Sequence, residues 1–113
     1  MKKVFAIVMA AMLVMAMFAG CQSAGGDANV IKIGTSGPLT GDYAVYGVAV
    51  KNGLELAFEE INALGGLQFA VNGQDDEADT EKAVNAYNNL MDWGMQIMAG
   101  PTTSGSAAAA AAE

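Results

Sequence analysis

The chain has 113 residues, with twelve acidic side chains against five lysines, no arginine, no histidine and one cysteine. The missing histidine argues against hydrolytic or zinc chemistry, and the scarcity of basic side chains argues against a nucleic-acid partner. A single cysteine excludes an intrachain disulfide. We therefore expect no catalytic centre, metal site or cofactor.

The N-terminal segment, residues 1–20, has the layout of a signal peptide. Lys2 and Lys3 precede an apolar stretch, residues 4–18, which is followed by the small residues Ala19 and Gly20. The alternative is a transmembrane anchor, but the apolar stretch has about fifteen residues, short of the roughly twenty that cross a bilayer core.

Cys21 follows the apolar stretch in a pattern, Phe18-Ala19-Gly20-Cys21, that resembles the bacterial lipobox. In that motif the cysteine is diacylated through its sulfur and becomes the mature N-terminus. Phe18 departs from the more usual leucine, and a plain cleavage region with an incidental cysteine is the alternative. Residues 21–29 are small and polar, which predicts a flexible tether that begins at a lipid-anchored Cys21.

The folded part is expected over residues 30–113. A β-branched strand over residues 30–33 ends at Gly34 and leads into a glycine- and hydroxyl-rich loop, residues 34–41. A helix over residues 43–64 follows and stops at Gly65-Gly66. Its apolar side chains recur at helical spacing: Val50, Leu54, Ala57, Phe58, Ile61 and Leu64.

A second strand over residues 67–73 leads into an acidic loop, residues 74–79. The next helix begins near Asp79 or Thr80 and ends at Gly94. We expect five of its side chains in the core: Ala83, Val84, Tyr87, Leu90 and Met91. A third strand over residues 95–99 then leads into a second hydroxyl-rich loop, residues 100–105, and into a third helix from Ser106.

The element order βαβαβα predicts an α/β fold, in which a parallel sheet carries helices on both faces. Three strands make only part of such a sheet and bury little core. The chain also stops inside an alanine-rich helix without a C-cap signal. We therefore expect a truncated product rather than a miniature domain with an alanine tail.

Ligands of open α/β sheets bind beyond the carboxyl ends of the strands, and both hydroxyl-rich loops fall there. Helix N-termini and neutral hydroxyls suit a carboxylate ligand. The candidates are Thr35, Ser36, Thr40, Thr102, Thr103 and Ser104, and the alternative for each is a helix cap or a turn former. Tyr43 and Tyr46 follow the first loop and could cover an apolar ligand.

Neither a nucleotide site nor a calcium site is indicated. The first loop lacks the Gly-x-Gly-x-x-Gly spacing of a dinucleotide site, and no lysine follows its last glycine as in a P-loop. The acidic cluster misses the EF-hand spacing, so a solvated face or charge bias at a helix N-terminus explains it. The cluster comprises Asp75, Asp76, Glu77, Asp79 and Glu81.

Taken together, the motifs are similar to the start of the leucine/isoleucine/valine-binding proteins, which are type I periplasmic binding proteins of ABC transporters. The similarity covers nearly all of the chain after the tether. It is carried by Ile31-Lys32-Ile33-Gly34, Gly37-Pro38-Leu39-Thr40-Gly41, Tyr46-Gly47, Asn52-Gly53, Glu59-Glu60-Ile61-Asn62-Ala63-Leu64-Gly65-Gly66, Asp75-Asp76, Lys82-Ala83-Val84 and Gly100-Pro101-Thr102-Thr103-Ser104-Gly105.

The resemblance implies a two-lobed protein that closes on a small ligand, and residues 30–113 would form part of its N-terminal lobe. By position, Ser104 matches the residue that holds the ligand's α-carboxylate, with backbone groups around Thr102 and Thr103 assisting. Tyr46 matches an aromatic side chain at the cleft.

The implied function is that of a bacterial extracytoplasmic solute-binding lipoprotein. It would capture a branched-chain or related amino acid without covalent chemistry and deliver it to ABC permease subunits, while Cys21 anchors it to the cell membrane. Two alternatives stay open: a ligand-sensing ectodomain of the same fold, and a binder of an amide- or urea-type solute. The lipobox favours the transporter subunit, because a sensor needs a transmembrane helix to its output module.

Overall fold

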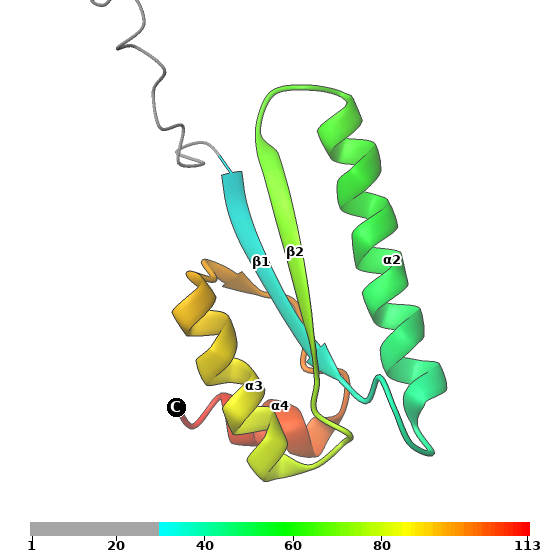
Figure 1. The fold of residues 1–113 in the computed structure, drawn as a ribbon, viewed down its shortest axis with the longest axis vertical. Coiled ribbons are helices and arrows are strands. Elements are labelled where there is room, and N and C mark those ends of the chain that lie inside the picture. The colour runs from blue at the N-terminus through cyan, green and yellow to red at the C-terminus, as the bar shows by residue number, and fades with distance from the viewer. Residues whose placement is uncertain (1–29) are drawn as a thin grey trace, which may run out of the picture.

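The computed structural model describes residues 30–113 of the protein. In this part of the chain, strands and helices alternate around one parallel sheet with the order β2-β1-β3 (Figure 1). The elements are β1 (Val30–Gly37), α2 (Ala44–Ala63), β2 (Gln68–Asp75), α3 (Thr80–Trp93), β3 (Ile97–Met98) and α4 (Ser104–Ala110). The predicted βαβαβα order is confirmed. The predicted signal peptide, tether and lipidated Cys21 lie outside the described residues.

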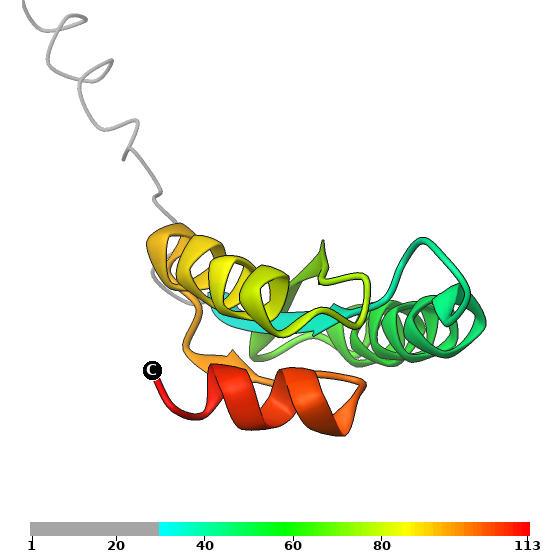
Figure 2. The ribbon, with the colours of Figure 1, turned by 90° about the horizontal axis from the view of Figure 1, so that it is seen from below.

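Helices α2 and α3 cover opposite faces of the sheet (Figure 2). Successive side chains of a strand point to opposite faces, so alternate strand residues contact different helices. On one face, the Lys32 ammonium donates to the Trp93 carbonyl at 2.9 Å and lies 5.2 Å from the centre of the Trp93 ring. On the other face, the rings of Phe58 in α2 and Phe69 in β2 lie 4.9 Å apart. The prediction of helices on both faces is therefore confirmed.

The strands differ in length from the prediction. β1 continues beyond Gly34 to Gly37, since the backbones of Thr35 and Ser36 pair with β2 in the same parallel register as the apolar residues before them. For the same reason β2 reaches Asp75. β3 is reduced to Ile97–Met98, which pair with Ile33 and Gly34, and α4 begins at Ser104 instead of Ser106.

The hydrophobic core of residues 30–113 is small, and its buried members are Ile33, Ala83, Ala86, Leu90 and Ala110. Of the five core residues expected in α3, Ala83 and Leu90 are buried, whereas Met91 is 49% exposed and Ala86 takes its place. The expected apolar face of α2 is also largely exposed, with Val50, Ile61 and Leu64 among its exposed side chains. The reason is that, among the helices and strands of the described residues, α2 packs mainly against β1 and β2.

No helix within residues 30–113 is long and apolar enough to cross a membrane.

The two ends of α3 follow the sequence signals. At the N-terminus, the Asp79 carboxylate accepts a hydrogen bond from the Lys82 backbone N–H at 2.9 Å, and it thereby satisfies a donor without an intrahelical partner. At the C-terminus, Gly94 adopts a left-handed conformation with φ of 90°, which glycine tolerates without a Cβ clash. Both boundaries are confirmed.

Replacing the N-cap residue tests this assignment. We expect Asp79→Ala to lower the free energy of unfolding of the complete gene product by about 1 kcal/mol, because the Lys82 N–H loses its acceptor. Asp92→Ala is the matched control, since Asp92 is exposed near the other end of α3 and caps nothing. Urea denaturation measures both variants, and equal stabilities would contradict the cap.

Candidate functional site

The candidate site lies where β1 and β3 end and their following loops begin (Figure 1). The second hydroxyl-rich loop docks onto the end of β1 through Thr102. The Thr102 backbone N–H and hydroxyl both donate to the Ser36 carbonyl, at 2.9 and 3.2 Å. Two segments that lie 66 residues apart in the sequence are thereby fixed at one edge of the sheet.

Gly37 is the point at which three segments meet. A Cβ atom at this position would lie 2.3 Å from the Thr102 hydroxyl oxygen and 3.4 Å from the Gly47 Cα atom. The loop after β3 and the first turn of α2 therefore both approach the end of β1. Since Tyr46 precedes Gly47 directly, this contact brings the part of the chain that carries Tyr46 close to Thr102.

Gly47 itself is needed by a second close approach. A Cβ atom on Gly47 would lie 2.1 Å from the Pro38 carbonyl oxygen, which is a backbone atom and cannot rotate away. The sequence patterns did not single out Gly37 or Gly47 as functional. The signal that could have identified Gly47 is its position in the first turn of a helix, because glycine there weakens the helix unless packing requires it.

The four predicted ligand-binding residues fall into two groups. The hydroxyls of Thr102 and Thr103 are used within the protein, since Thr102 donates to Ser36 and Thr103 donates to the buried Ser106 hydroxyl at 2.9 Å. Ser104 is exposed at the first position of α4, and Tyr46 is 62% exposed in the first turn of α2. Ser104 and Tyr46 are thus the two side chains that remain accessible to a ligand.

The start of α4 offers backbone donors beside Ser104. Thr103 is the N-cap residue, with an extended conformation, and its side chain makes no capping hydrogen bond. The first N–H groups of a helix have no intrahelical acceptor. The neighbourhood of Ser104 therefore combines a hydroxyl with uncapped backbone N–H groups.

Two of the hydroxyl candidates predicted in the first loop are not accessible to a ligand. Thr35 and Ser36 lie within β1 and are buried. Ser36 donates its hydroxyl to the Asp76 carboxylate at 3.1 Å, and the Asp76 carboxylate also accepts the Ala78 backbone N–H at 2.9 Å. Because Asp76 is fully buried, its explanation as part of a solvated acidic face is wrong.

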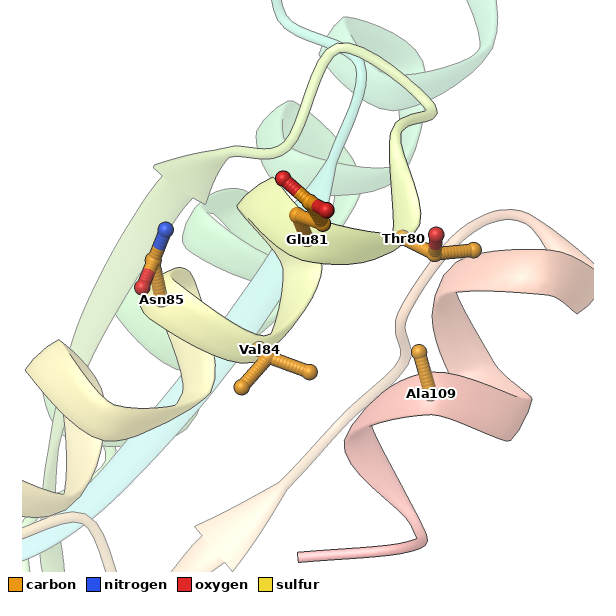
Figure 3. A pocket seen from close by; sticks show the side chains of 5 residues that line it. All are labelled: Thr80, Glu81, Val84, Asn85 and Ala109. Carbon is orange, nitrogen blue, oxygen red and sulfur yellow. The ribbon is translucent and has the colours of Figure 1, made fainter.

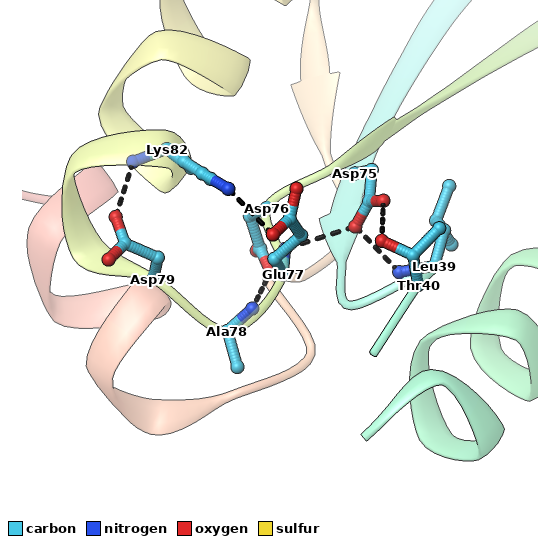
Figure 4. A network of polar contacts seen from close by, with 8 residues as sticks. All are labelled: Leu39, Thr40, Asp75, Asp76, Glu77, Ala78, Asp79 and Lys82. Atoms are coloured by element: carbon cyan, nitrogen blue, oxygen red, sulfur yellow. Dashed lines mark hydrogen bonds and ion pairs between the residues drawn. The ribbon is translucent and has the colours of Figure 1, made fainter. Parts of the chain in front are cut away.

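Asp75 is likewise not a simple solvated charge. Its carboxylate accepts hydrogen bonds from the Leu39 N–H at 2.8 Å, the Thr40 hydroxyl at 2.6 Å and the Glu77 N–H at 3.0 Å (Figure 4). Partial burial opposes ionisation, but these hydrogen bonds outweigh it and hold the pKa of Asp75 below its ordinary value of 3.8. The stabilising effect is therefore present above that value and is lost as the pH falls through the lowered pKa.

The remaining members of the acidic cluster, Glu77, Asp79 and Glu81, are exposed as predicted. Glu77 forms a surface ion pair with Lys82 at 2.6 Å. Within residues 30–113, no group of three or more acidic, histidine or cysteine side chains is arranged to hold a metal ion.

The grooves of the described residues lie elsewhere. One of about 470 Å³ runs between α3 and α4 and is lined by Thr80, Glu81, Val84, Asn85 and Ala109 (Figure 3). A second, of about 430 Å³, lies between Tyr87 and the alanines of α4 and reaches Gly100 and Pro101. Neither groove includes Ser104 or Tyr46, so the candidate site is an open edge in this part of the chain.

Comparison with known proteins shows what the chain is similar to. A family model described as periplasmic binding protein matches residues 30–112. The Leu/Ile/Val-binding protein BraC3 of Rhizobium johnstonii is 40% identical over 78 residues, which cover 66% of this chain and 21% of that protein. The leucine-, isoleucine-, valine-, threonine-, and alanine-binding protein of Pseudomonas aeruginosa is 37% identical over 82 residues, or 70% of this chain and 22% of that protein.

Among solved structures, the branched-chain amino acid transporter substrate binding protein LivJ from Streptococcus pneumoniae, in complex with isoleucine, matches with a TM-score of 0.69 and 39% identity. The match covers 74% of this chain and 25% of that one. The chain therefore spans about a quarter or less of the length of the relatives that it matches.

The close approach at Gly47 can be tested by adding one methyl group. We expect Gly47→Ala to destabilise the complete gene product by about 1–3 kcal/mol, because the new Cβ atom meets the Pro38 backbone. Gly53→Ala is the matched control in the same helix: it meets no atom within 4 Å, so it should stabilise the protein by about 0.5–1 kcal/mol. Urea denaturation distinguishes the two, and a Gly47→Ala protein as stable as the unaltered one would contradict the contact.

Proposed function

The chain belongs to the periplasmic binding protein family, and we propose that it serves as the extracytoplasmic solute-binding subunit of an ABC transporter that imports a branched-chain or related amino acid. The observation that carries this proposal is the agreement of sequence and structure with one relative: 39% identity and a TM-score of 0.69 to a binding protein in complex with isoleucine. The activity proposed is reversible binding without catalysis.

In the proposed mode of binding, the ligand's α-carboxylate contacts the Ser104 hydroxyl and the backbone N–H groups at the start of α4. Ser104 suits this role because it is exposed at an uncapped helix start, and because neutral hydroxyl and amide donors can bind a carboxylate without a buried countercharge. Thr102 and Thr103 contribute through the backbone, since their hydroxyls already have partners in the protein.

Tyr46 is proposed to flank the ligand at the same edge. Its ring is 62% exposed, and the contact of Gly37 with Thr102 and Gly47 keeps its turn of α2 near the second loop. An aromatic ring of this kind can cover an aliphatic side chain while its hydroxyl stays in water. The groups that hold the ammonium and select the side chain are proposed to lie in the part of the relatives' length that this chain does not span.

Cys21 is proposed to anchor the protein to the outer surface of the cytoplasmic membrane. The support is the order of a basic start, an apolar stretch and Ala19-Gly20-Cys21 in the sequence. Two or more acyl chains on one residue give stable anchoring, whereas a single chain gives only marginal binding. The polar residues between Cys21 and Val30 would let the folded part stand away from the lipid surface.

Isothermal titration of the complete gene product tests the ligand and the role of Ser104 together. We expect saturable binding of isoleucine, leucine or valine, and a loss of about ten- to a hundredfold in affinity for Ser104→Ala, because a hydrogen bond to a charged group contributes roughly 1.5–3 kcal/mol. Binding of urea or simple amides in preference to amino acids would favour the other solute class. An unchanged affinity of the variant would remove Ser104 from the site.

The lipid anchor is tested by Cys21→Ser. In bacteria fed a labelled fatty acid, we expect the unaltered protein to take up label and to sediment with membranes. Cys21→Ser should remain unlabelled, because an oxygen replaces the sulfur that carries the acyl glycerol. Ser23→Ala is the control for a nearby change that leaves the cysteine intact. Equal labelling of the Cys21→Ser protein would contradict the proposed anchor.

A further inference from the structure

The loop between β1 and α2, residues 38–43, is attached to the sheet through one carboxylate. The Leu39 N–H donates to Asp75 Oδ1 at 2.8 Å, and the Thr40 hydroxyl donates to Asp75 Oδ2 at 2.6 Å. The Glu77 N–H donates to Oδ1 as well, at 3.0 Å, and holds the carboxylate from the other side. Asp75 therefore uses both of its oxygens to fix this loop to the end of β2 (Figure 4).

Few other hydrogen bonds hold the start of α2. Its N-cap residue, Tyr43, makes no side-chain capping hydrogen bond, and its first turn carries no acidic residue. The backbone hydrogen bonds around it, from Ala44 to Gly41 and from Tyr46 to Tyr43, stay within the loop and the first turn. In the described part of the chain, the hydrogen bonds from residues 38–43 to the sheet end on Asp75.

The start of the loop is joined to the first turn of α2 by a separate contact. Pro38 is buried, and its backbone lies so close to Gly47 that no Cβ atom fits between them. Pro38 thus packs the start of the loop against α2, and Asp75 holds the residues that follow, Leu39 and Thr40. Tyr46 is the residue before Gly47, so its position depends on both contacts.

We propose that Asp75 is a positioning residue for ligand binding, whose carboxylate fixes the loop of residues 38–43 so that Tyr46 is held at the ligand-binding edge. This inference rests on the proposed function. Asp75 does not contact the ligand in this scheme; it acts through Tyr46. A free loop would let the first turn of α2 shift, and the order lost in the unbound protein would have to be restored on binding.

The test uses the complete gene product with Asp75→Ala, Asp75→Asn and, as a matched control, Asp92→Asn, which changes an exposed acid with no loop contact. Thr40→Val removes only one of the hydrogen bonds and serves if the Asp75 variants do not fold. The first measurement, without ligand, is hydrogen exchange of the amides in residues 39–46. We expect about tenfold faster exchange or more for Asp75→Ala, and no change for the control.

The second measurement is a double-mutant cycle for isoleucine affinity, with Asp75→Ala and Tyr46→Ala singly and together. If Asp75 acts through Tyr46, Asp75→Ala weakens binding about fivefold or more in the presence of Tyr46 and less than about twofold in its absence. A role in general stability would give the same loss in both backgrounds. Additive losses, or unchanged exchange in residues 39–46, would therefore overturn the inference while the proposed function stands.

Failure of the unaltered protein to bind any branched-chain amino acid would overturn the proposed function, and this inference with it.

Discussion

The candidate site is built on the close backbone contact at the carboxyl end of β1. A Cβ atom on Gly37 would clash with the Thr102 side chain and would lie 3.4 Å from the Gly47 Cα atom, so both neighbours pack against this glycine. This contact fixes the second loop and the first turn of α2 relative to the strand between them. Without it, the first turns of α4 and α2, which carry Ser104 and Tyr46, would lose a shared contact at the end of β1.

Two acidic residues beside this contact accept hydrogen bonds from neighbouring segments, whereas the buried Thr35 hydroxyl has no hydrogen-bond partner within residues 30–113. Asp76, which is fully buried, accepts hydrogen bonds from the Ser36 hydroxyl and the Ala78 N–H, and a buried carboxylate without such donors would be strongly destabilising. Asp75, its neighbour, accepts hydrogen bonds from Leu39 and Thr40 in the loop between β1 and α2. Successive residues at the end of β2 thus serve different purposes: Asp75 holds the loop of residues 38–43 that precedes α2, and Asp76 stabilises the buried edge of the sheet.

The sequence allowed the helices to be predicted more accurately than the strand ends or the roles of the acids. α2 and α3 were predicted closely, because apolar spacing, the Asp79 cap and Gly94 are local signals. The extension of β1 through Thr35 and Ser36 was missed, since their hydroxyls suggest a loop and only pairing with β2 reveals a strand. Asp75 and Asp76 were misjudged for a similar reason: their partners, Leu39 and Ser36, lie 36 and 40 residues away, a distance that no local pattern reports.

The charges near the site explain why recognition of a carboxylate would depend on neutral donors. Within residues 30–113 each lysine is engaged elsewhere: Lys32 with Trp93, Lys51 with Glu55 and Lys82 with Glu77. None of these pairs includes Ser104 or Tyr46. The charged side chain that is hydrogen-bonded to the first loop is Asp75, an anion. In the proposed mode of binding, a ligand carboxylate would be stabilised by hydroxyl and backbone dipoles instead of a buried ion pair with a lysine. Such contacts would suit the proposed reversible binding, because no charge of the protein loses a partner when the ligand leaves.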